Sequence, residues 1–131
     1  MRSVDVCLTH QDFDNYDHKG KIVVVIDVLR ATSTINTLLF LGADHVRPIG
    51  SLEECKSLKD HDYIIMAERL GKKVEGFDYG NSPTKLTEKD IKGKKVAIAT
   101  SNGSKAIIKS EGSEMTIPVS YTHLTLPTIR S

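Results

Sequence analysis

The chain has 131 residues, with 18 basic and 17 acidic side chains and a formal net charge of +1. This balance gives no reason to expect a surface for nucleic acid or anionic membranes. Apolar residues make up 39% of the sequence, which is typical of one soluble globular domain or part of one. The longest apolar run is too short to span a bilayer and no secretory leader is evident, so we expect a cytoplasmic protein with reduced Cys7 and Cys55.

The apolar pattern predicts short strands that alternate with helices. The predicted strands are residues 4–8, 22–26, 45–49, 63–67 and 96–99. The predicted helices are residues 35–41, 51–58, 87–91 and 104–109. The second of these helices opens with a capping box formed by Ser51 and Glu54. Residues 22–26 are almost continuously β-branched, which is typical of a strand buried on both faces.

The alternation of strands and helices predicts the α/β fold class, with a mostly parallel sheet and helices on both of its faces. Residues 68–83 form the least regular stretch, with three glycines and a proline among charged side chains. A loop of that length inside a compact domain is usually functional or disordered.

Two segments share one design, in which an apolar strand leads through a short polar turn into a helix. They are residues 23–35, VVVIDVLRATSTI, and residues 96–108, VAIATSNGSKAII. The strand end and the helix N-terminus meet at the edge of the sheet, where free backbone N–H groups favour an anion. Helix capping by the Ser, Thr and Asn side chains is the alternative for either turn alone. Two such turns, with Arg30 in the first, favour an oxyanion site.

Carboxylates follow the same strands. Asp27 ends the predicted strand 22–26, where a lone carboxylate is costly without a partner. A metal ion would supply one, and a structural pair with Arg30 is the alternative. Glu68 closes the strand 63–67 in the same topological position, and Asp78 follows in the irregular loop. Three carboxylates near one edge match the oxygen ligands that Mg²⁺ prefers.

Other phosphate chemistries are excluded by spacing. A cysteine phosphatase needs Arg six positions after its Cys, where Cys7 has Phe13 and Cys55 has His61. The sequence contains no Gly-Lys-Ser/Thr P-loop. A haloacid-dehalogenase nucleophile needs Asp-x-Asp, which Asp27 does not begin. Two distant cysteines do not suit zinc.

Three blocks of the sequence together resemble the 2-phosphosulfolactate phosphatase family. They are residues 26–35, IDVLRATSTI, residues 68–83, ERLGKKVEGFDYGNSP, and residues 100–107, TSNGSKAI. The third block departs slightly, because the family usually has two Thr before Asn-Gly-Thr. The resemblance spans residues 4–108, and the family's chain continues well beyond this point. The resemblance therefore implies that this chain is the N-terminal part of a larger α/β fold.

The resemblance implies a Mg²⁺-dependent phosphatase that hydrolyses 2-phospho-3-sulfolactate to 3-sulfolactate and phosphate, on the route to coenzyme M. A related 2-hydroxy-acid phosphate is an alternative substrate that is also consistent with the resemblance. The expected partner is a small-molecule phosphate monoester, with no nucleic acid or membrane, and the full-length parent could be a homodimer.

Residue pattern and resemblance together give candidate roles. The candidate catalytic residues are Asp27, Arg30 and Glu68, and the candidate metal ligands are Asp27, Glu68 and Asp78. The candidates for binding phosphate and substrate are Thr32, Ser33, Thr34, Arg69, Asn81, Ser82, Asn102, Gly103 and Ser104. The candidates for reading the sulfonate are Arg69, Lys72 and Lys105.

The end of the sequence has a different character. Residues 119–128, VSYTHLTLPT, resemble the conceptual translation of a transposase sequencing adapter. We therefore expect residues 1–118 to be the N-terminal portion of a phosphatase domain and residues 119–131 to be a non-native tail. A genuine C-terminal tail is the alternative.

Two other functional interpretations stay open. A non-catalytic phospho-ligand-binding α/β module would use the same anion-binding turns and would not need carboxylates for Mg²⁺. The chain could also be an inactive fragment of an active parent. Measured phosphate release, with and without Mg²⁺, separates these interpretations from a phosphatase.

Overall fold

The computed structural model of the chain describes residues 3–120. The strands are β1 (Ile22–Ile26), β2 (His45–Ile49), β3 (Tyr63–Arg69), β4 (Lys72–Lys73), β5 (Lys95–Ala99) and β6 (Met115–Val119). The helices are α1 (Ala31–Phe40), α2 (Leu52–Ser57), α3 (Glu88–Ile91) and α4 (Gly103–Lys109). Short 3₁₀ turns lie at Asp12–Asn15, Leu58–His61 and Pro83–Lys85. Parallel strands alternate with helices, so the predicted α/β class is confirmed.

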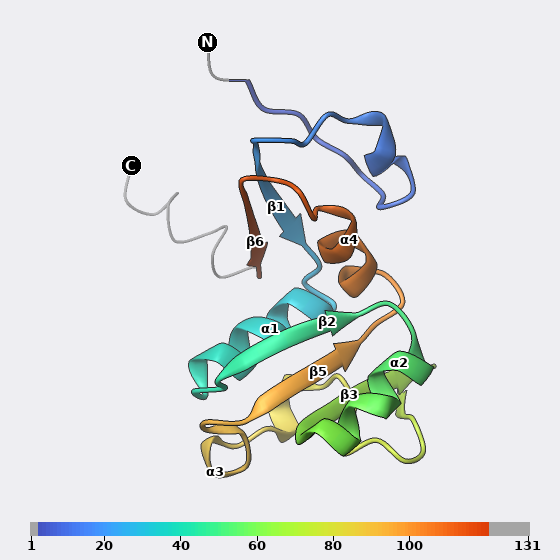
Figure 1. Cartoon of the computed structure of the whole chain (residues 1–131), viewed down its shortest axis with the longest axis vertical. Helices are drawn as coiled ribbons and strands as arrows, with labels where there is room; N and C mark the ends of the chain where they lie inside the picture. The colour runs from blue at the N-terminus through green and yellow to red at the C-terminus, as the bar shows by residue number, and fades with distance from the viewer. Residues whose placement is uncertain (1–2, 121–131) are drawn as a thin grey trace.

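The strands are divided between two sheets (Figure 1). A four-stranded sheet has the order β2-β5-β3-β4, in which β5 runs parallel to both neighbours and β4 pairs antiparallel with the end of β3. The other sheet consists of β1 and β6, which are parallel and in register from Ile22 opposite Met115 to Ile26 opposite Val119. Among residues 3–120, no helix combines the length and apolar character that crossing a membrane requires.

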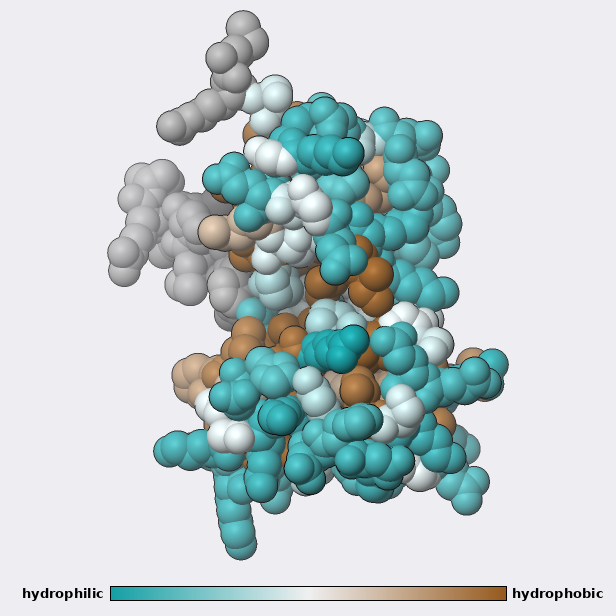
Figure 2. All heavy atoms as spheres, viewed as in Figure 1, coloured by the Kyte–Doolittle hydropathy of each residue, from teal (hydrophilic) through white to brown (hydrophobic). Residues whose placement is uncertain are grey.

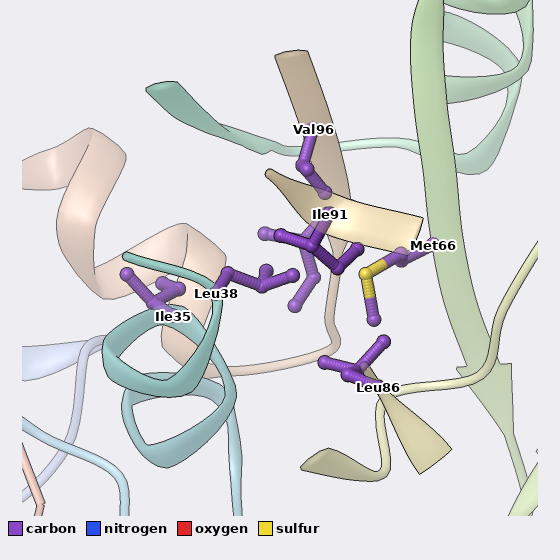
Figure 3. Packing of buried hydrophobic residues seen from close by; sticks show 7 residues of the cluster. Ile35, Leu38, Met66, Leu86, Ile91 and Val96 are labelled. Carbon is purple, nitrogen blue, oxygen red and sulfur yellow. The ribbon is translucent and has the colours of Figure 1, made fainter. Parts of the chain in front are cut away.

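Both faces of the four-stranded sheet are covered. One face packs against α1, and its buried cluster is shown in Figure 3: Ile35, Leu38, Met66, Leu86, Ile91, Val96 and Ile98. The opposite face packs against α2, with a buried cluster formed by Ile49, Cys55, Ile65, Ala67, Phe77, Ala97 and Ala99. Successive residues of β3 and β5 enter opposite clusters, as the alternation of side chains along a strand requires. Burial raises the pKa of the Cys55 thiol to about 11, so this side chain stays neutral.

The prediction that residues 22–26 are buried on both faces is wrong. Val25 is buried, but Ile22, Val24 and Ile26 are 60%, 50% and 54% exposed. The reason is that β1 pairs with β6 alone, while helix α4 contacts β1 and helix α1 contacts β6. Figure 2 shows a largely hydrophilic surface with hydrophobic atoms in the hollow between the two parts of the molecule.

The ends of the described chain differ from the sequence-based expectation. Residues 4–8, all within the described range, form no strand. Strand β6 was not predicted, and Val119, assigned to the non-native tail, is its last residue. The Thr32 hydroxyl donates to the Val119 carbonyl over 2.6 Å. Residues 121–131 of that tail lie outside the described residues.

Helices α2, α3 and α4 each begin within one residue of the predicted start, whereas α1 does not. The capping box is confirmed at α2, where the Ser51 hydroxyl accepts a hydrogen bond from the Glu54 backbone N–H over 3.2 Å. Helix α1 begins at Ala31, four residues before the predicted start, because its first turn consists of small and hydroxyl residues that the apolar pattern does not register. Because of this early start, only residues 27–30 separate the end of β1 from the helix N-terminus.

Candidate active site

A cleft of about 480 Å³ lies beyond the carboxyl ends of β1, β3 and β5. Its polar lining consists of Asp27, Arg30, Glu68, Asn81, Thr100, Ser101 and Asn102. Leu29, Ala31, Leu70 and Gly71 complete the lining. The carboxyl edge of parallel strands is where open α/β sheets bind ligands. Of the candidate residues, the structure therefore brings Asp27, Arg30, Glu68, Asn81 and Asn102 to one place.

Asp27 is held by the N-termini of two helices. Its carboxylate accepts backbone hydrogen bonds from Ala31, the first residue of α1, and Gly103, the first residue of α4. Burial raises the pKa of the Asp27 carboxyl, and the two hydrogen bonds only partly offset this effect. The Asp27 carboxylate therefore lies at the N-termini of both helices, where the helix dipole favours a negative charge.

Gly103 allows this close approach. A Cβ atom at Gly103 would lie 2.3 Å from the Ala31 Cβ and 2.7 Å from Asp27 Oδ2. Neither distance is compatible with a side chain, so only glycine brings the α4 N-terminus onto the carboxylate. The sequence suggested Gly103 as a phosphate-binding residue, and the structure shows it in contact with Asp27.

Arg30 pairs with Glu68 across the cleft. The guanidinium Nη2 donates to Glu68 Oε2 and links the turn before α1 to the end of β3. The alternative of a structural Asp27–Arg30 pair is thus not what the chain forms. Both side chains remain partly accessible, so the pair can still meet a ligand in the cleft.

The hydroxyl groups of the first turn bind backbone atoms. Thr32 Oγ1 accepts from the Asp27 N–H at 3.0 Å, and Ser33 Oγ donates to the Val28 carbonyl at 2.9 Å. Thr34 Oγ1 donates to the Asn81 carbonyl at 2.8 Å. These bonds hold the turn in place, and a role of Thr32, Ser33 and Thr34 in binding phosphate stays a prediction.

The second turn is built in the same way. The Ser104 backbone N–H donates to Thr100 Oγ1 at 2.8 Å, and the buried Ser104 hydroxyl donates to the Ile98 carbonyl at 3.1 Å. Ser104 therefore closes the first turn of α4, whereas Thr100, Ser101 and Asn102 line the cleft. Those three are the residues of this turn that a ligand can reach.

Asn81 is the most buried polar residue of the cleft, with 5% of its surface exposed. Its Nδ2 donates to the Ala99 carbonyl at 3.1 Å, which ties the irregular loop to the end of β5. Its Oδ1 is buried and has no hydrogen-bond partner in the part of the chain that the structure describes. A buried acceptor without a partner costs about 1–3 kcal/mol, which makes this atom a candidate for binding a ligand.

Other candidates lie outside the cleft. Asp78 Oδ2 accepts from the Ile65 N–H at 2.9 Å, and Asp78 Oδ1 binds Lys59 Nζ at 3.1 Å. Arg69 and Lys72 face each other in the β3–β4 ladder, and Ser82 hydrogen-bonds to Thr84. Lys105 is exposed on α4. The sequence did not suggest Leu29, Leu70 or Gly71, because the Leu side chains carry no reactive group.

The described part of the chain holds no group of three or more His, Cys, Asp or Glu side chains arranged for a metal ion. The cleft does offer oxygen ligands alone, from the Asp27 and Glu68 carboxylates and the Asn81 carboxamide. Mg²⁺ is commonly bound by one or two carboxylates, with water and substrate phosphate as its other ligands. These oxygen donors are therefore of the chemical type that binds Mg²⁺.

Comparison with known proteins identifies the relatives of this chain. The sequence model of the 2-phosphosulpholactate phosphatase family matches residues 7–124. The chain belongs to this family. A probable 2-phosphosulfolactate phosphatase of Clostridium acetobutylicum is 43% identical over 111 residues, which cover 82% of this chain and 47% of the relative.

Two further members of the family show a similar sequence identity to this chain. The protein of the same name from Caldanaerobacter subterraneus subsp. tengcongensis is 42% identical over 113 residues, covering 83% of this chain and 47% of the relative. That from Clostridium perfringens is 41% identical over 110 residues, covering 79% of this chain and 44% of the relative. The chain thus spans about half the length of the curated phosphatases it matches.

Membership of the family fits the charges in the cleft. Asp27 and Glu68 face a single cation, Arg30, among the charged residues of the lining. A phosphate monoester carries up to two negative charges, which this cleft does not balance by its own side chains. Binding of a phosphate group at this place would therefore call for further positive charge.

Proposed function

We propose that this chain supplies the phosphate site of a Mg²⁺-dependent phosphatase that hydrolyses 2-phospho-3-sulfolactate to 3-sulfolactate, or a related 2-hydroxy-acid phosphate. The proposal rests on one observation: in a member of this family, Asp27, Arg30 and Glu68 share a cleft at the carboxyl ends of parallel strands. A place on the route to coenzyme M, a cytoplasmic location and a homodimeric parent belong to the same proposal.

Arg30 binds the substrate phosphate in this proposal. Its planar guanidinium presents two parallel N–H donors, which match two phosphate oxygens. Glu68 orients the guanidinium across the cleft and leaves part of it accessible. Arg30 therefore acts before and during bond cleavage, by positioning the phosphate and compensating its charge.

Asp27 and Glu68 would hold Mg²⁺ at the same edge. Bound there, Mg²⁺ would supply charge neutralisation at the phosphate oxygens. The amides of Ala31 and Gly103 fix the Asp27 carboxylate, so its oxygens do not reorient when substrate arrives. Thr100, Ser101 and Asn102 also line the cleft and would contact the rest of the substrate.

The test is phosphate release by the purified chain from 2-phospho-3-sulfolactate, with Mg²⁺ and with a chelator. We expect release that requires Mg²⁺ and a lower kcat with a higher KM in Arg30→Lys, because Lys lacks the bidentate fork. Arg47→Lys is the matched control, since Arg47 lies on β2 and binds Glu54 outside the cleft. Its kinetics should equal those of the wild type.

Two results would contradict the proposal. Substrate that binds in equilibrium dialysis, but releases no phosphate at any Mg²⁺ concentration, would contradict a phosphatase and indicate a non-catalytic binding module or an inactive fragment. Equal kinetic constants for Arg30→Lys and the wild type would show that Arg30 is only a structural partner of Glu68.

A further inference from the structure

We propose that the carboxamide oxygen of Asn81 is a ligand of the divalent cation, together with the Asp27 carboxylate, and that Asp78 is not. This inference rests on the proposed function and adds to it the identity of a ligand. It replaces one of the three carboxylates that the sequence suggested with a neutral oxygen.

The orientation of the Asn81 side chain is fixed from two sides. Its backbone carbonyl accepts from Thr34 Oγ1 of α1, and its Nδ2 donates to the Ala99 carbonyl of β5. A rotation that exchanged Nδ2 and Oδ1 would place two oxygens against each other at Ala99. The chain therefore holds Oδ1 in one position, in a residue that lines the cleft.

The unpartnered atom is an acceptor, and this decides what it can bind. Oδ1 has lone pairs and no hydrogen, so it repels the oxygens of a phosphate. A hard divalent cation is attracted by the same lone pairs, and amide oxygens are among its ordinary ligands. Asp27, an anionic oxygen donor, lines the same cleft and supplies the charge.

The remaining carboxylates are already engaged. Glu68 binds the Arg30 guanidinium through Oε2, which leaves this carboxylate one oxygen for a cation. Asp78 accepts a backbone hydrogen bond from Ile65, pairs with Lys59 and does not line the cleft. Asn81 therefore lines the cleft and carries a side-chain oxygen that could bind a cation without breaking an existing hydrogen bond.

The experiment titrates the full chain with Mn²⁺ alone and follows the free ion by electron paramagnetic resonance, with Mg²⁺ as competitor. We expect Asn81→Leu and Asp27→Asn each to weaken Mn²⁺ binding at least tenfold. Asp78→Asn is the matched control, because it removes a carboxylate charge from the same loop, and its dissociation constant should stay within twofold of the wild type.

A second measurement needs no variant and so does not depend on the folding of Asn81→Leu. In the ¹⁵N spectrum of the wild type, substoichiometric Mn²⁺ should broaden the Asn81 side-chain NH₂ signal before the backbone amide of Ile65, which marks Asp78. The inference would be overturned if the Ile65 signal broadened first or if Asn81→Leu still bound Mn²⁺ tightly. It would also be overturned if the wild type bound no Mn²⁺.

Phosphate release is measured separately on the same samples. Mn²⁺ binding that depends on Asn81 in a chain without turnover supports the ligand assignment and contradicts the proposed function. Mg²⁺-dependent turnover that is unchanged in Asn81→Leu supports the function and overturns the ligand assignment.

Discussion

Strands β1 and β5 are both five residues long and have similar apolar sequences, yet their surroundings differ. In β5 the side chains from Val96 to Ala99 are all buried, because β2 and β3 flank the strand and helices cover both faces. In β1 every second side chain is exposed, because one neighbouring strand and one helical layer surround it. A continuous apolar run therefore indicates a strand but does not determine how many layers cover it.

The candidate site lies where these two regions meet. Asp27 follows β1, whereas Glu68 and Thr100 lie at the ends of β3 and β5 in the other sheet. Gly103 and Ala31 join the regions by donating to the Asp27 carboxylate from two helices. The geometry of the cleft thus depends on a junction as well as on the well-covered sheet.

The largest expected effect is in the covered sheet. Ile98→Ala removes a fully buried side chain from the cluster shared with α1, and should lower the free energy of unfolding by about 2–5 kcal/mol. Ile26→Ala, on the open face of β1, is the control and should cost about 1 kcal/mol or less. Urea denaturation followed by circular dichroism measures both. Equal losses would contradict the contrast between the strands.

The next largest loss of stability is expected at the junction of the two sheets. Gly103→Ala places a methyl group against Ala31 and Asp27, which should cost about 1–3 kcal/mol through overpacking. Gly50→Ala is the control, because its Cβ would meet only Ile108 at an ordinary 3.5 Å. Thermal unfolding compares the two variants. A Gly103→Ala protein as stable as Gly50→Ala would mean that the helices are not held together at Asp27.

The sequence predicted the alternation of elements, the α2 capping box and the positions of Asp27, Arg30 and Glu68 at strand ends, because these depend on neighbouring residues. It did not predict β6, whose MTIPV segment contains a proline and lacks a clear alternation of apolar residues. It also did not predict that Arg30 would pair with Glu68, 38 positions away. Such contacts depend on sheet order, which local patterns do not encode.

A smaller effect is expected from the titration of Asp27. Burial raises the pKa of this carboxyl in the folded chain, so the folded state binds its proton more tightly than the unfolded state. The resulting contribution to stability is fully present below the ordinary carboxyl pKa and is lost as pH rises through the folded value. The free energy of unfolding of the wild type, minus that of Asp27→Asn, should therefore fall between pH 4 and neutrality. Urea titrations at several pH values measure it, and a rising or constant difference would contradict the raised pKa.

The smallest expected effect tests the open face of β1 directly. Val24→Thr keeps the β-branched shape and replaces a methyl group with a hydroxyl, which water can solvate on a half-exposed strand. It should change the free energy of unfolding by no more than about 0.5 kcal/mol.

The matched exchange Val96→Thr buries the same hydroxyl in β5 and should cost about 1–3 kcal/mol. Equal costs, measured by urea denaturation at several protein concentrations, would show that the face bearing Val24 is covered in solution. A cost that grows with protein concentration would identify a second copy of the chain as the cover.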